Sequence, residues 1–150
     1  MELVCKVEIN QSAQKVWQVI TDIEGCDQYI SGIKSVEIID RPKTGLIGLK
    51  WRETRVMFGK EAVETMWITD CEENVYYQTR AENHGAIYKT ILSIEELQDK
   101  VILTMAFSGT STNMFVKIIS SIISFMMMGS MRKMLDKDLS DIKQQAEKSA

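Results

Sequence analysis

The chain has 150 residues, with 18 Lys and Arg against 21 Asp and Glu, which gives a formal net charge of -3. Hydrophobic residues make up 45% and charged residues 26%, a composition typical of a globular domain and not of a disordered chain. The acidic balance argues against non-specific nucleic-acid binding, which needs an excess of basic side chains, so we expect no nucleic-acid partner.

The cysteine and histidine counts restrict the chemistry further. Three cysteines, an odd number at long spacings, predict free thiols in a reducing compartment. His84 is the only histidine, which excludes zinc sites that need two imidazoles, and we expect no metal. Glu2 and Lys6 interrupt the first apolar run, so we predict no signal peptide and a cytoplasmic protein. Nucleotide-binding glycine motifs are absent, so we expect no cofactor.

No linker or repeat divides the sequence, so we expect residues 1–150 to form a single domain. Residues 2–9 alternate loosely and predict a strand. Ser12 is placed to cap a helix whose apolar positions are Ala13, Val16, Trp17 and Ile20. A short segment between two glycines, residues 26–31, predicts a second short helix.

From Ile33 to Gly109 the hydrophobic pattern has period two. It predicts six strands, near 34–41, 47–58, 60–70, 74–82, 86–96 and 100–108. Turn-forming residues separate them at short intervals, which is too little chain for crossover helices. We therefore predict an antiparallel meander.

After Gly109 the period becomes helical and continues to the C-terminus. The apolar stripe runs through Phe115, Ile119, Ile122 and Met126, and then through Met127, Met131, Leu135, Leu139, Ile142 and Ala146. The uncharged run from Ile118 to Met131 is shorter than the roughly 20 apolar residues that a membrane span needs, so we predict a helix that packs on the sheet. Gly129 is a point where this helix could bend.

A long antiparallel sheet with one apolar face must be covered, and one long helix covers only part of it. We therefore predict an α+β fold with an elongated cavity between sheet and helix, the usual place for a small apolar ligand.

Several short segments resemble one family. They are Ser12–Asp22 (SAQKVWQVITD), Tyr29–Ile33 (YISGI), Gly48–Thr54 (GLKWRET), Glu61–Thr69, and the run Met131–Leu135 followed by Asp138 and Leu139. Their order and spacing resemble the START-like or SRPBCC superfamily, which includes the polyketide cyclase/dehydrase group. The resemblance implies a helix-grip fold: a curved antiparallel sheet of about seven strands around a long C-terminal helix, with two short helices after the first strand.

Alternation puts Glu53 and Arg55 on one strand face with Trp51. If this face points inward, the two charges could pair or orient a polar ligand group. The alternative is that the register slips and both side chains are solvated, since long charged residues are rarely buried alone.

The predicted ligand-binding residues combine this strand with aromatic and helical positions. They are Trp51, Glu53, Arg55, Trp67, Tyr77, Tyr88, Phe115, Ile119, Ile122 and Met126. The methionine cluster from Met126 to Met134 suits either a pliable cavity wall or an ordinary core. His84 is expected in a solvated turn.

Three functions remain open. The first is binding of a small hydrophobic molecule, such as a lipid, an isoprenoid or a polyketide-like ring. The second, which the resemblance implies, is a cyclase or dehydratase that would use Glu53 and tyrosines as acid–base groups. The third is a module whose C-terminal helix docks on a membrane surface or a partner protein.

Overall fold

The computed structural model describes residues 2–57, 59–83, 85–111 and 114–148, with the side chains of 111–127 left out. The elements in chain order are β1 (Glu2–Ile9), α1 (Ala13–Ile20), a 3₁₀ turn η1 (Cys26–Gln28), β2 (Ile33–Asp40), β3 (Lys50–Met57), β4 (Lys60–Glu72), β5 (Tyr76–Asn83), β6 (Ala86–Glu96), β7 (Val101–Ser111) and α2 (Met114–Glu147). The fold is α+β, as predicted. The second expected helix is a single 3₁₀ turn, because so short a segment cannot repay the cost of helix nucleation.

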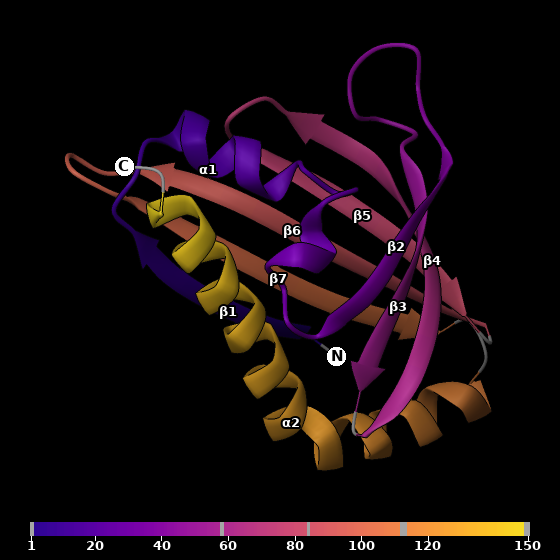
Figure 1. Ribbon diagram of the computed structural model, residues 1–150. Coiled ribbons are helices and arrows are strands. Elements are labelled where there is room, and N and C mark those ends of the chain that lie inside the picture. Colours follow the sequence, from indigo (N-terminus) through magenta and orange to yellow (C-terminus); the bar gives the residue numbers. More distant parts are fainter. Residues whose placement is uncertain (1, 58, 84, 112–113, 149–150) are drawn as a thin grey trace.

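The strands form one seven-stranded antiparallel sheet in the order β1-β7-β6-β5-β4-β3-β2. The last six strands make the predicted meander, and β1 pairs with β7 along its whole length. Register shifts interrupt the β2–β3 and β4–β5 pairs near Asp40 and Asp70. In Figure 1 the β2–β3–β4 end of the sheet curls across β5–β7.

The short helix α1 starts where the sequence predicts. The Ser12 side chain accepts a hydrogen bond from the Lys15 backbone N–H at 3.1 Å, which satisfies one of the free amides of the first turn. The predicted apolar positions of α1 are all buried. This stripe holds α1 against the same face of the sheet that α2 covers (Figure 1).

The long helix α2 packs mainly against β1 and β7. Leu135, Leu139, Ile142 and Ala146 of the predicted stripe are buried, and they belong to one hydrophobic core with Ile9 of β1 and Leu103 of β7. The earlier, orange part of α2 runs in a different direction from the later, yellow part (Figure 1). Within the part of the chain that the structure describes, no helix is long and apolar enough to cross a membrane.

Candidate functional site

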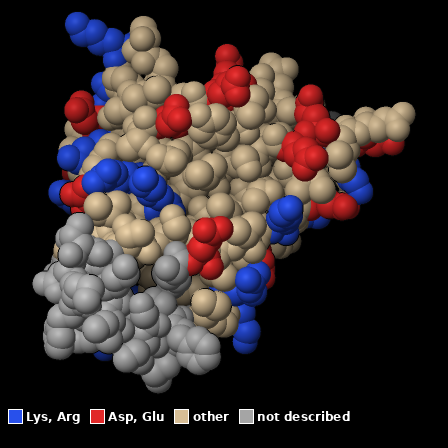
Figure 2. All heavy atoms as spheres, turned by 180° about the vertical axis from the view of Figure 1, so that it is seen from behind, with Lys and Arg blue, Asp and Glu red and all other residues tan. Residues whose placement is uncertain are grey.

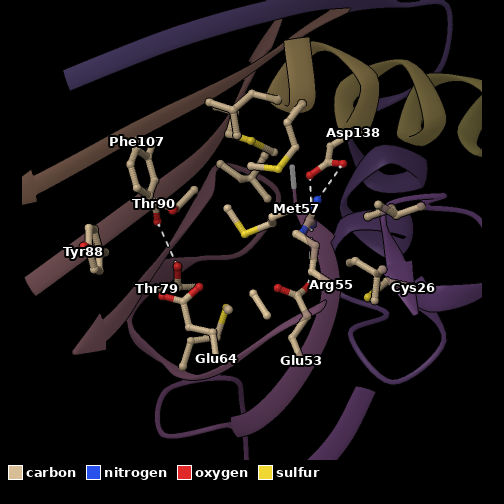
Figure 3. A pocket seen from close by; sticks show the side chains of 18 of the residues that line it. Cys26, Glu53, Arg55, Met57, Glu64, Thr79, Tyr88, Thr90, Phe107 and Asp138 are labelled. Carbon is tan, nitrogen blue, oxygen red and sulfur yellow. Dashed lines mark hydrogen bonds and ion pairs between the residues drawn. The ribbon is translucent and has the colours of Figure 1, made fainter. Parts of the chain in front are cut away.

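A cavity of about 560 Å³ lies between the curved sheet and the C-terminal half of α2. It exists because β2–β4 bend over the strands behind them while α2 covers only one end of the sheet. Two sides of this cavity differ in character (Figure 3). We call them the apolar wall, made by Tyr88, Leu92, Met105 and Phe107 of β6 and β7, and the polar wall, made by Glu53, Arg55, Glu64 and Asp138.

The apolar wall consists of inward-facing residues of two paired strands. The rings of Tyr88 and Phe107 stack with centroids 5.8 Å apart. Leu92 pairs directly with Met105 in the register, and both are buried. Stacked aromatic and branched aliphatic side chains present a large, rigid apolar surface, which is suited to an apolar molecule.

An ion pair between β3 and α2 is the centre of the polar wall. The Arg55 guanidinium donates to both carboxylate oxygens of Asp138, with Nη1–Oδ1 at 3.1 Å and Nη2–Oδ2 at 2.9 Å. Both side chains are largely buried, 13% and 7% exposed. This fork geometry is the strongest arrangement of such a pair, and it links strand to helix across the cavity (Figure 3).

Glu53 lies two residues before Arg55 on the same face, and its side chain is only 12% exposed. Its Oε1 is 3.8 Å from Arg55 Nη2, too far for a hydrogen bond. Burial raises the pKa of the Glu53 carboxyl to about 7; Arg55 acts in the opposite direction, and Asp138 and Glu64 add to the rise. Glu53 is therefore divided between its neutral and charged forms near neutral pH.

Glu64 of β4 stands directly opposite Glu53 in the β3–β4 register. Both line the cavity, and side chains that are directly opposite on one sheet face have Cβ atoms about 5 Å apart. Burial also raises the pKa of the Glu64 carboxyl, and Arg55 lowers it. The described residues provide neither of these carboxyls with a hydrogen-bond donor of normal length.

The segment between η1 and β2 supports the Arg55–Asp138 pair. A Cβ built on Gly32 would come within 3.0 Å of Arg55 Nη1, so the missing side chain leaves room for the guanidinium. One turn along α2 from Asp138, Asp141 accepts hydrogen bonds from the backbone N–H and hydroxyl of Ser31 at 2.9 and 3.0 Å. Two aspartates of α2 thus hold the β2–β3 end of the sheet against the helix.

Near the cavity, two tyrosine hydroxyls already donate hydrogen bonds within the protein, and one cysteine is an unreactive thiol. Tyr77 donates its hydroxyl hydrogen to the Ile20 carbonyl at 3.1 Å, and Tyr29 donates to the Val19 carbonyl at 2.6 Å. Burial, followed by the nearby Glu53, raises the pKa of the Cys26 thiol to about 12. Cys26 is therefore a neutral thiol and not an activated nucleophile.

The structure brings together five of the predicted site residues. These residues, which all line the cavity, are Trp51, Glu53, Arg55, Tyr77 and Tyr88. Glu53 and Arg55 therefore face the cavity and not the solvent, the two orientations that the sequence left open. Their role in binding a ligand stays a prediction.

Trp67 occupies a different place from the one we expected. It pairs with Lys50, which lies on the face of β3 opposite to Trp51, and Lys50 Nζ is 5.5 Å from the Trp67 ring centroid. Alternation along β4 sends Met66 and Ile68 inward and Trp67 outward. We therefore no longer include Trp67 in the site.

The predicted helix residues Phe115, Ile119, Ile122 and Met126 have side chains outside the described residues, as has Met127, and His84 lies outside them altogether. Within the methionine cluster, Met131 and Met134 line the cavity, whereas Met128 is exposed.

The sequence reasoning missed Glu64 and Asp138, although both carried a signal. Glu64 alternates with the inward Ala62 and Met66, and Asp138 falls at helical spacing between Leu135 and Ile142.

On the face of the molecule turned away from α1, the described acidic and basic side chains are mixed and do not form a patch of one charge. Figure 2 shows acidic and basic side chains scattered around the margin of a largely uncharged face. Among the described residues, no group of three or more His, Cys, Asp or Glu side chains is arranged to hold a metal ion.

Comparison with known proteins gives a family and a set of related folds. The family model described as "Polyketide cyclase / dehydrase and lipid transport" matches residues 2–147. A search of the curated proteins finds no match.

Three solved structures illustrate the likeness in fold. A protein from Thermus thermophilus superposes with a TM-score of 0.80 at 15% identity, covering 97% of each chain. A START superfamily protein from Mycobacterium smegmatis gives 0.76 at 17% identity, covering 99% of each chain. The Zhui aromatase/cyclase from Streptomyces sp. R1128 gives 0.77 at 15% identity, covering 98% of this chain and 93% of that one. At these identities the likeness concerns the fold alone.

Proposed function

The chain belongs to the polyketide cyclase/dehydrase and lipid transport family, and from this premise we propose that it binds a small, largely apolar molecule in the cavity between the sheet and α2. The observation that carries the proposal is the cavity itself, about 560 Å³ with an apolar wall on one side and a few polar groups on the other. A volume of this size and lining is typical of sites for small organic ligands.

The two walls contribute differently to ligand binding. Contact with Leu92, Met105 and Phe107 removes apolar ligand surface from water, at about 25 cal/mol per Å² before the entropy lost on association. The polar wall supplies hydrogen bonds that orient the molecule, with Glu53 as the group most open to a ligand, because Arg55 is already paired with Asp138.

A neutral fluorescent probe tests this proposal without a known ligand. Nile red is titrated into the wild-type protein and into a Thr90→Phe variant, whose new ring projects from the inward face of β6 into the cavity. We expect saturable fluorescence enhancement with the wild type and at least about tenfold weaker binding with the variant, which is a loss of about 1.4 kcal/mol.

Thr104→Phe is the matched control, because Thr104 alternates with the buried Leu103 and Met105 and so lies on the outward face of β7. This variant should bind Nile red like the wild type. Equal binding by Thr90→Phe, or no binding by the wild type, would refute a ligand cavity.

A second function is favoured by one observation, the buried Glu53 with a pKa of about 7. A carboxyl group that ionises near neutral pH at a cavity wall is suited to general acid–base catalysis, as a cyclase or dehydratase needs. Incubation with a poly-β-keto thioester tests it: aromatic product should absorb in the near ultraviolet with the wild type and not with Glu53→Gln. A turnover that Glu53→Gln leaves unchanged rules out this role.

The remaining alternative is docking of α2 on a membrane or a partner protein. The side chains of Phe115, Ile119 and Ile122, on which it depends, lie outside the described residues. It stays a prediction, and flotation of the protein with liposomes checks it.

A further inference from the structure

The charges that line the cavity are unbalanced. Among the described residues, four strongly ionisable side chains face it: Glu53 and Arg55 from β3, Glu64 from β4, and Asp138 from α2. Three are acids and one is a base. Cys26, Tyr29, Tyr77 and Tyr88 also line the cavity and contribute thiol and hydroxyl groups.

Arg55, the one base on the described lining, is not available to an anionic ligand. Asp138 occupies the Nη1 and Nη2 side of the Arg55 guanidinium in a two-point contact at 3.1 and 2.9 Å. Gly32 lies against Nη1, close enough that even a methyl group there would crowd it. A ligand carboxylate or phosphate would have to displace Asp138, leaving a buried carboxylate without its counter-ion.

The two acids that remain, Glu53 and Glu64, face one another across the β3–β4 pair and both point into the cavity (Figure 3). The described residues donate no hydrogen bond to either carboxyl, and Glu53 makes an ion pair with Arg55 at 3.8 Å. Glu53 is largely buried, with 12% of its side chain exposed, and its carboxyl oxygens are acceptors at the cavity wall that water or a ligand can reach.

We propose that the cavity selects an apolar molecule that ends in a basic amine, whose ammonium group sits between Glu53 and Glu64, over the same molecule ending in a carboxylate or phosphate. An ammonium group brings several N–H donors to two carboxyls that accept no hydrogen bond from the described residues, and a second positive charge to a wall where Arg55 is the one cation among three acids. An anionic group at the same place would instead meet like charge. This inference rests on the proposed function, because it assigns the ligand class of the same cavity.

The occupancy of this site by an ammonium is linked to the protonation of Glu53. Burial raises the pKa of the Glu53 carboxyl to about 7, Arg55 lowers it, and Asp138 and Glu64 add to the rise; the Cys26 thiol is the other titratable group nearby. A bound ammonium stabilises the carboxylate, so amine binding releases the Glu53 proton. The affinity for an amine should therefore rise as the pH rises through about 7, whereas that for a carboxylate should fall.

Three probes with the same ten-carbon chain isolate the effect of the end group: decylamine, decanol and decanoate. Each is measured by displacement of Nile red from the wild type at about pH 6 and about pH 8. At the higher pH we expect decylamine to bind at least about tenfold more tightly than decanoate, with decanol between them, because a tenfold ratio is a modest electrostatic preference. Only decylamine should gain affinity from the lower pH to the higher.

Variants assign this preference to the two carboxyls. The double variant Glu53→Gln with Glu64→Gln keeps the size and polarity of both side chains and removes their charge. The affinities of the three probes for it should lie within about threefold of each other, compared with the ratio of at least about tenfold expected for the wild type. Glu61→Gln is the matched control, since Glu61 is on the same strand as Glu64 but exposed and paired with Lys34. It should behave like the wild type.

The outcomes separate this inference from the proposed function. If Nile red is displaced equally well by all three probes, or best by decanoate, the cavity binds apolar molecules but the amine selectivity is wrong. An amine preference that persists in the double variant also overturns it. If neither Nile red nor any probe binds, the proposed function and this inference both fail.

Discussion

The two walls of the cavity show how differently a sheet can use its inward positions. On β6 and β7, alternation places Leu92, Met105 and Phe107 inward, and these side chains need no partner beyond each other. On β3 and β4 the same alternation places Glu53, Arg55 and Glu64 inward, where each is unfavourable unless it is paired. In the proposed function, the apolar wall provides affinity and stability, and the polar wall provides selectivity at a cost in stability. Four predictions test this division.

The largest expected effect is on the Arg55–Asp138 pair. Arg55→Met leaves Asp138 and Glu53 buried without a cation, and we expect the free energy of unfolding to fall by about 3 kcal/mol or more. Urea denaturation measures this change. Arg52→Met, in which an exposed arginine loses its contact with Glu37, should cost less than about 1 kcal/mol. Equal losses for both variants would contradict a special role for the buried pair.

The next effect is a loss of stability at higher pH. The pKa of Glu53 is about 7 in the folded protein and about 4.3 in an unfolded chain, so between these values the folded state alone holds the proton. Since the folded state binds more protons there, the free energy of unfolding should fall as the pH rises from about 4.5 to about 7, by roughly 3 kcal/mol from this group.

Urea denaturation at about pH 5 and about pH 8 measures this loss. Glu53→Gln should reduce the difference between the two pH values and leave the parts due to Glu64 and Asp138, because burial also raises the pKa of both these carboxyls. A pH dependence unchanged by the substitution would mean that Glu53 is ionised throughout this range.

On the apolar wall, Leu92→Ala should lower the free energy of unfolding by about 2 kcal/mol, the lower end for a buried leucine, because Leu92 already borders a cavity. Leu97→Ala, at a residue that is 42% exposed, should change it by less than about 0.5 kcal/mol. Thermal unfolding followed by circular dichroism compares the two. A negligible effect at Leu92 would show that the apolar wall does not contribute to stability.

The smallest effect concerns a side chain that belongs to neither wall. Tyr77→Phe removes the hydroxyl that donates to the Ile20 carbonyl and should lower the free energy of unfolding by about 1 kcal/mol. Nile red affinity should not change, because this hydroxyl serves α1 and not a ligand. A clear loss of probe binding without a loss of stability would assign Tyr77 to ligand recognition instead.

The sequence predicts the architecture well because the architecture depends on periodicity. The period-two pattern located each strand to within a few residues, the Ser12 cap marked the start of α1, and the spacing of Leu135, Leu139 and Ile142 marked the buried face of α2. The resemblance to the START-like superfamily depended on the same segments. The inward placement of Glu53 and Arg55 also follows from alternation.

The partners of these residues could not be predicted, since they join distant parts of the chain. Asp138 reaches Arg55 across 83 positions, and nothing in either local pattern specifies that contact. Trp67 has an aromatic ring suited to a ligand cavity, but its position in β4 alternates outward, where the ring lies beside Lys50. Tyr77 was expected to orient a ligand, and only the packing of α1 shows that its hydroxyl is already engaged.

A crystal structure of the protein as purified from its expression host tests the central claim most directly. We predict continuous electron density for an apolar molecule in the cavity, in contact with Leu92 and Phe107, with its polar end toward Glu53 and Glu64. A cavity filled by side chains of the protein itself would contradict the account.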